Sequence, residues 1–228
     1  IYAISNKFST LYMGIYNVFG LSFTESASKH IGDKDKDEYF SSVINKAIIY
    51  FAQIIIGMML VLPLIYNILV NEKYIESYVY VPILLLASLF HVILSLYGSI
   101  YITNKKTKQI MKTSIYAAII NIIINVLFIK YIGLFAASLS TLLAYFFMTI
   151  YRYKDVKKYT IIKYDIKNLL LNTLLMIIVI ISYYFNIFSL NIIIFLLALF
   201  TIIILDLKDI KSIYKYLKNT IKCRFDKK

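Results

Sequence analysis

Polar side chains recur at helical spacing within otherwise apolar stretches of this 228-residue chain. They are carboxamides, hydroxyls, one imidazole and one ammonium, which donate and accept hydrogen bonds; the ammonium also attracts anions as a point charge. The chemistry that these groups predict is the binding and passage of a polar ligand. The predicted substrate-path residues are Asn6, Lys7, Thr10, Asn17, His91, Ser95, Asn121 and Asn125.

Each group of polar residues falls on one side of its helix when it is placed at about 100° per residue. The first stripe comprises Asn6, Lys7, Thr10, Gly14 and Asn17, the second Ser88, His91, Ser95, Gly98 and Ser99, and the third Ser114, Ala118, Asn121 and Asn125. Because lipid offers no hydrogen bonds, polar side chains within a membrane span must face protein or water. Three such stripes predict a shared hydrophilic cavity.

The same residue types also have a structural role, since interhelical hydrogen bonds of about 0.6 kcal/mol join helices in membranes. Asn121 and Asn125 fit either role, and His91 fits a packing residue or a proton relay. Lys7 differs in kind, because an ammonium near the middle of a membrane costs about 2.5–3.5 kcal/mol on insertion scales. It fits a functional cation, or a side chain that extends to the membrane surface.

Long apolar runs set the elements that carry these residues. The chain is 61% hydrophobic, with two prolines and six glycines, and about 20 apolar residues suffice for a helix to cross about 30 Å of hydrocarbon. We therefore predict an all-α membrane protein, a bundle of seven transmembrane helices. The predicted spans are residues 1–23, 45–70, 79–103, 112–131, 133–151, 168–187 and 190–206.

Lysine and arginine orient the spans. Of the 25 basic residues, 22 lie in the connections 24–46, 104–112 and 152–167 and in the tail 207–228. Short cytoplasmic loops collect Lys and Arg, so the start of this sequence is expected outside and its tail in the cytoplasm. The net charge of +13 then suits anionic lipids at the cytoplasmic face rather than nucleic acid.

The spans also differ in polarity. Gly133, Ala137 and Thr141 recur at four-residue spacing, which favours close helix packing in the interior of the bundle. The sixth and seventh predicted spans are nearly uniform Leu, Ile and Phe, which predicts peripheral, lipid-facing helices. We therefore divide the chain into three parts. They are a five-span transport lobe (1–160), two additional peripheral helices (161–207) and a basic cytoplasmic tail (208–228), expected to lie on the membrane as a surface helix.

Signs of catalysis are missing from the sequence. The predicted outward connections are too short for a catalytic domain, and no glycine-rich phosphate loop is present. His30 and His91 are isolated, and Cys223 is the sole cysteine. We therefore expect no enzyme, no catalytic residue, no metal and no cofactor.

Two stretches carry a family resemblance. Residues 1–40 read IYAISNKFSTLYMGIYNVFGLSFTESASKHIGDKDKDEYF. Residues 97–152 combine a lysine-rich turn, a helix with two asparagines, a short Ile-Gly turn and an Ala/Ser-rich helix. Both resemble the second half of Wzx-type polysaccharide and O-antigen flippases, in the multidrug/oligosaccharidyl-lipid/polysaccharide exporter superfamily. The resemblance covers residues 1–160, with Ser9 standing near a position where many members have proline.

The resemblance implies one half of a 14-helix, two-lobed flippase fold in the bacterial inner membrane, so this chain is expected to be a fragment that needs an N-terminal half. Its implied function is to flip undecaprenyl-pyrophosphate-linked glycans for polysaccharide, O-antigen or lipopolysaccharide biosynthesis. Lys7 would then attract the pyrophosphate, and Asn6, Asn17, Asn121 and Asn125 would bind sugar hydroxyls.

Two other functions stay open at this stage. A small-molecule or drug exporter of the same superfamily would use a similar cavity and would show ion-coupled efflux. A seven-helix membrane receptor would share the predicted topology. Retinal attachment, however, needs a lysine in the last span, and residues 190–205 contain none.

Overall fold

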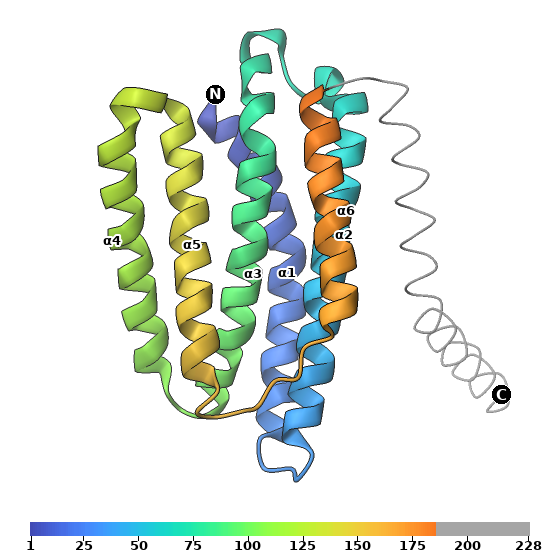
Figure 1. The fold of residues 1–228 in the computed structure, drawn as a ribbon, viewed down its shortest axis with the longest axis vertical. Coiled ribbons are helices and arrows are strands. Elements are labelled where there is room, and N and C mark those ends of the chain that lie inside the picture. Colours follow the sequence, from blue (N-terminus) through green and yellow to red (C-terminus); the bar gives the residue numbers. More distant parts are fainter. Residues whose placement is uncertain (186–228) are drawn as a thin grey trace, which may run out of the picture.

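The computed structural model describes residues 1–185, and within that range the chain is almost entirely helical, with no strand (Figure 1). The elements are α1 (Tyr2–His30), α2 (Lys36–Leu69), the 3-10 helix η1 (Glu72–Tyr80), α3 (Val81–Thr103), α4 (Thr107–Ile132), α5 (Leu134–Val156) and α6 (Ile166–Phe185). The predicted all-α class is confirmed for this part of the chain. The predicted span 190–206 and the basic tail lie outside the described residues.

Five helical stretches are long and apolar enough to cross a membrane, which indicates a membrane protein. They are Lys36–Leu69, Glu72–Thr103, Thr107–Ile132, Leu134–Val156 and Ile166–Phe185. α1 has the length, at 29 residues, but its polar stripe lowers its hydropathy and it is not among the five. The count of seven spans stays a prediction.

The predicted connection 24–46 is helical for most of its length. α1 runs on to His30 and α2 begins at Lys36, so the charged turn shrinks to residues 31–35. The imidazole of His30 stacks on the ring of Tyr39, with the ring centres 4.2 Å apart, and Phe23 meets Phe40 edge to face. These contacts continue the packing of α1 on α2 beyond the apolar runs, which is why hydropathy ended α1 too early and began α2 too late.

The connections gather by charge at the two ends of the bundle (Figure 1). The turn 31–35, the turn after α3 and the connecting segment 157–165, all of which contain lysine, lie at one end. η1 and Gly133, which joins α4 to α5 with a positive φ of 55°, lie at the other. This arrangement agrees with the predicted alternation, while the side that faces the cytoplasm stays a prediction.

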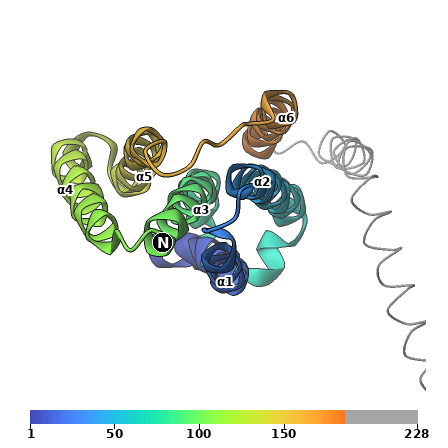
Figure 2. The same cartoon turned by 90° about the horizontal axis from the view of Figure 1, so that it is seen from below.

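α3 occupies the centre of the bundle and packs against α1, α2 and α5 (Figure 2). An aromatic cluster fills the space between α1 and α2, where the rings of Tyr12, Tyr16 and Phe19 all meet Phe51. α4 makes most of its contacts with α5, and α6 makes most of its contacts with α2. α4 therefore leaves most of its apolar surface uncovered by residues 1–185.

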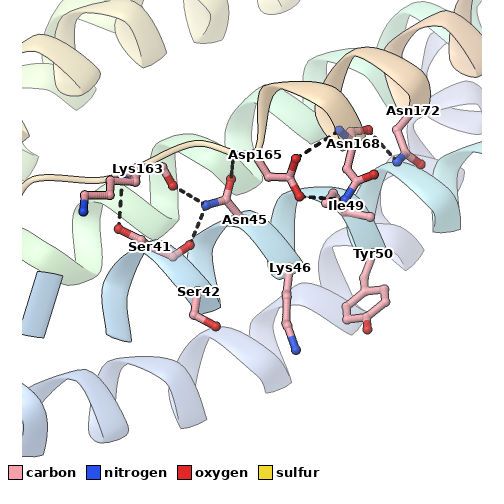
Figure 3. Close-up of a pocket in the computed structure, with 10 residues that line it drawn as sticks. All are labelled: Ser41, Ser42, Asn45, Lys46, Ile49, Tyr50, Lys163, Asp165, Asn168 and Asn172. Carbon is pink, nitrogen blue, oxygen red and sulfur yellow. Dashed lines mark hydrogen bonds between the residues drawn. The ribbon is translucent and has the colours of Figure 1, made fainter. Parts of the chain in front are cut away.

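Side chains of α2 fix the connecting segment 157–165 by hydrogen bonds to its backbone (Figure 3). The Nδ2 of Asn45 donates to the carbonyl oxygen of Lys163 at 2.7 Å, and its Oδ1 accepts from the amide of Asp165 at 2.9 Å. The hydroxyl of Ser41 accepts from the amide of Lys163 at 2.9 Å. Asp165 then accepts from the amide of Asn168 at 3.2 Å in the first turn of α6.

Candidate functional site

One face of α3 lines two neighbouring hollows. The α1 hollow, of about 380 Å³, lies between α1, α3 and the basic ends of α4 and α5. It is lined by Tyr16, Asn17, Gly20, Leu21, Thr24, Ser95, Gly98, Ser99, Ile102, Ile110 and Arg152. The α4 hollow, of about 360 Å³, is lined by His91, Leu94, Ser114, Ala117, Ala118, Asn121, Ile122, Ala144 and Tyr145.

The surface of the α1 hollow is mostly apolar, and hydroxyl, carboxamide and guanidinium groups form its smaller polar part. The hydroxyls of Thr24 and Ser99 lie 2.8 Å apart and join α1 to α3. Asn17 is exposed and Ser95 is half-buried on facing helices of the same hollow. The second predicted stripe therefore meets part of the first in this hollow.

Arg152 is the most unusual side chain of the α1 hollow. It is 3% exposed and lies in the last turns of α5. Its Nη1 donates to the carbonyl oxygen of Leu94 at 2.7 Å, and its Nε donates to the hydroxyl of Thr113 at 2.9 Å. Its Nη2 donates to the same hydroxyl at 2.5 Å and to the carbonyl oxygen of Ile110 at 3.4 Å. One guanidinium thus joins α3, α4 and α5.

The charge of Arg152 has only neutral partners within residues 1–185. The nearest acid on its own helix, Asp155, instead accepts hydrogen bonds from the hydroxyl of Tyr101 at 2.8 Å and the ammonium of Lys158 at 2.6 Å. The guanidinium also lies 5.8 Å from the ring centre of Tyr101. A buried charge is costly unless it is paired. Arg152 therefore leaves the α1 hollow with a net positive charge.

The absence of a side chain at Gly98 leaves space for the guanidinium of Arg152. A Cβ atom added at Gly98 would lie 3.2 Å from Nη1 of Arg152, which is tighter than ordinary contact. The hydrogen bonds described above use four of the five N–H donors of a guanidinium. The remaining donor belongs to Nη1, the atom that lies against Gly98.

The α4 hollow combines a ring pair with a carboxamide. The rings of His91 and Tyr145 stack with their centres 4.5 Å apart, which gives His91 a packing role. The Nδ2 of Asn121 donates to the hydroxyl of Thr141 at 3.0 Å, so Asn121 joins α4 to α5 while it lines the hollow. The Oδ1 of Asn125, one turn farther along, is buried and has no hydrogen-bond partner among the described residues.

The remaining predicted residues lie elsewhere. Asn6, Lys7 and Thr10 are exposed on the outer face of α1, and neither hollow includes them. The hydroxyl of Thr10 donates to the carbonyl oxygen of Asn6 within the same helix at 2.9 Å. The structure thus brings Asn17 and Ser95 to one hollow, and His91 and Asn121 to the other. It brings Asn6, Lys7, Thr10 and Asn125 to neither.

Sequence reasoning missed Arg152, because it follows the predicted span 133–151 and was counted with the basic connection. A signal was present. Arg152 continues the series of Thr141, Tyr145 and Met148, which recurs every three or four residues on α5. Helical periodicity would have placed the arginine on the packed side of α5.

A third hollow, of about 360 Å³ between α2 and α6, holds Ser41, Asn45, Asp165 and Asn168 (Figure 3). Each of these side chains takes part in the hydrogen bonds that fix the connecting segment and the start of α6. Residues 1–185 also contain no group of three His, Cys, Asp or Glu side chains suited to a metal ion. The α1 hollow is therefore the stronger candidate for a ligand.

Comparison of the chain with family models, curated proteins and solved structures gives no match. Membership of a family therefore stays the expectation raised by the resemblance of residues 1–40 and 97–152.

Proposed function

We propose that this chain is the C-terminal half of a bacterial inner-membrane flippase that moves undecaprenyl-pyrophosphate-linked glycans during polysaccharide or O-antigen biosynthesis. The observation that carries the proposal is Arg152, a guanidinium without a carboxylate partner within residues 1–185, which lines a hollow beside hydroxyl and carboxamide groups in a bundle of apolar helices. The chain acts as a carrier and not as an enzyme.

The substrate explains the chemistry required. A sugar-pyrophosphate head group cannot cross hydrocarbon unaided, so it needs a polar route that opens to one side of the membrane at a time. The α1 hollow lies toward the basic end of the bundle, where such a head group would enter from the side that carries the lysines. A guanidinium stays charged and attracts phosphate, and one N–H of Arg152, on Nη1, is left by the hydrogen bonds to α3 and α4. In the proposed complex Arg152 attracts the pyrophosphate, while Asn17, Ser95 and Thr24 bind sugar hydroxyls. A cationic drug is a poorer fit, because the charge that lines the α1 hollow is positive.

The other lobe has a natural place in this proposal. The outer face of α1 carries Leu11, Val18 and Leu21, which are 65%, 72% and 77% exposed, beside the polar Asn6 and Lys7. In a two-lobed transporter this mixed face would meet the N-terminal half. Lys7 would then lie between the lobes, where a cation can attract the same pyrophosphate.

The decisive variants are Arg152→Gln and Asn17→Leu in the full-length protein. We expect Arg152→Gln to lower the rate of glycan flipping in reconstituted vesicles about 10- to 100-fold, because a hydrogen bond to a charged group contributes about 1.5–3 kcal/mol. Lys154→Gln, at an exposed position of the same helix, is the matched control and should flip at the normal rate.

Because Arg152 also joins three helices, each variant is checked for its amount in the membrane and for its thermal stability. Asn17→Leu separates the two roles, since Asn17 is exposed in the α1 hollow and no hydrogen bond to the described residues fixes its side chain. It should slow flipping without loss of stability. Normal flipping by folded samples of both variants would refute the proposal.

A further inference from the structure

An apolar groove of about 520 Å³ opens between α5 and α6, on the side of the bundle away from α1 (Figure 2). α3 forms its floor through Phe90 and Ile93, and Ile150 of α5 and Ile177 of α6 form its walls. α6 packs on α2 rather than on α5. Within the described residues, α5 and α6 are thus linked mainly by the connecting segment 157–165, and side chains leave the space between them open.

The groove changes character at the basic end of the bundle, where three tyrosines line it. The hydroxyls of Tyr97 and Tyr164 lie 2.8 Å apart, and the rings of Tyr153 and Tyr164 lie 5.7 Å apart. The ammonium of Lys157 lies 4.3 Å from the ring centre of Tyr153. The groove therefore ends in tyrosine hydroxyls, and the ammonium of Lys157 lies beside this end, on the ring of Tyr153.

We propose that this groove is a binding site for one anionic phospholipid of the surrounding bilayer. One acyl chain fills the apolar part between α5 and α6. The phosphate meets Lys157 and the tyrosine hydroxyls at the basic end. Tyrosine suits this level of the membrane because it has an apolar ring and a polar tip. Lysine near an anionic surface contributes about 1 kcal/mol of attraction.

Charge and position select this ligand. A lipid without a negative head group would leave Lys157 without an anion, and a soluble phosphate would leave the apolar walls of the groove uncovered. The groove opens away from the α1 hollow, so the bound lipid is separate from the proposed transport route and does not depend on it. Its effect is structural, because the lipid chain supplies the contacts that α5 and α6 do not make with each other.

The experiment uses the absence of tryptophan from the chain. Phe90→Trp places a single fluorescent reporter in the groove, and Phe147→Trp places one on the exposed outer side of α5 as the matched control. The full chain is reconstituted in zwitterionic lipid with increasing fractions of brominated anionic phospholipid, which quenches tryptophan on contact. At low fractions we expect stronger quenching of the Phe90→Trp reporter than of the control.

Lys157→Gln tests the charge and is compared with Lys154→Gln. We expect the anionic preference at Phe90→Trp to fall about fivefold with Lys157→Gln, as expected for one lysine near the head group, and to persist with Lys154→Gln. Three results would overturn the proposal. The first is equal quenching of the two reporters by the anionic lipid. The second is equal quenching of Phe90→Trp by brominated anionic and brominated zwitterionic lipid. The third is no quenching of Phe90→Trp by either lipid, as expected if protein rather than lipid covers the groove.

Discussion

Asn45→Ala isolates the contribution of one carboxamide to the docking of the connecting segment. Asn45 is 9% exposed and makes two hydrogen bonds to backbone groups of that segment, at 2.7 and 2.9 Å. A third bond, to the carbonyl oxygen of Ser41, stays within α2 and contributes little to docking. Each bond between elements contributes about 1 kcal/mol net, and a buried group left without a partner costs about 1–3 kcal/mol.

The hollow beside Asn45 admits water to part of the vacated site, so the lower end of that range applies. We expect Asn45→Ala to lower the free energy of unfolding by about 2 kcal/mol. The assay is equilibrium unfolding of the purified full chain by SDS in mixed micelles. Hydrogen exchange of the amide of Asp165, which has lost its acceptor, should rise in parallel.

Ser42→Ala is the matched control, because Ser42 lines the same hollow and is exposed. It should change the unfolding free energy by less than about 0.5 kcal/mol. The reasoning is refuted if the two variants unfold alike, or if exchange at the amide of Asp165 is unchanged. Either result would mean that α6 holds the connecting segment in place without the help of α2.

Further outcomes follow from other residues. Gly98→Ala should destabilise the fold and slow flipping, because its Cβ would press on the buried guanidinium of Arg152. Gly14→Ala has open space around it, and thermal unfolding should show a rise of up to about 1 kcal/mol in the free energy of unfolding. Asn121→Leu should cost about 0.6–1.7 kcal/mol in SDS unfolding, because it removes the bond to Thr141 and the longer bond from Ser140. Asn125→Leu removes an oxygen without a partner among the described residues and should not destabilise. Burial and a neighbouring tyrosine raise the pKa of Tyr164. The unfolded state therefore loses the Tyr164 proton first, near pH 10, and the free energy of unfolding should fall above that pH. Unfolding at several pH values, with and without Tyr164→Phe, measures how much of this fall is due to Tyr164.

Hydropathy was sufficient to place three consecutive helices among residues 1–185. The runs that predicted spans at 79–103, 112–131 and 133–151 correspond to α3, α4 and α5 within a few residues. The clustering of basic residues in alternate connections also matched their arrangement at one end of the bundle. Both signals are local, since each depends on composition within a window and not on which helices are neighbours.

The candidate site was less accessible to sequence reasoning. An angular stripe shows which residues share a side of a helix, but not which helix covers that side. Ser95 and Asn17 meet across the α1 hollow, whereas Lys7 on the same stripe as Asn17 stays exposed. Arg152 was ambiguous for a related reason, because a charge at the end of an apolar run fits a solvent loop as well as a buried helix end.

The position of α4 has a consequence for synthesis in the membrane. Helices emerge in chain order, and α4 finds few partners among α1, α2 and α3, which precede it. Among residues 1–185 its main partner is α5, which follows it in the chain through the tight turn at Gly133. Arg152 lies near the end of α5, and its hydrogen-bond acceptors belong to α3 and α4. The guanidinium of Arg152 can therefore form its hydrogen bonds to α3 and α4 only after the helical hairpin α4–α5 has inserted into the membrane.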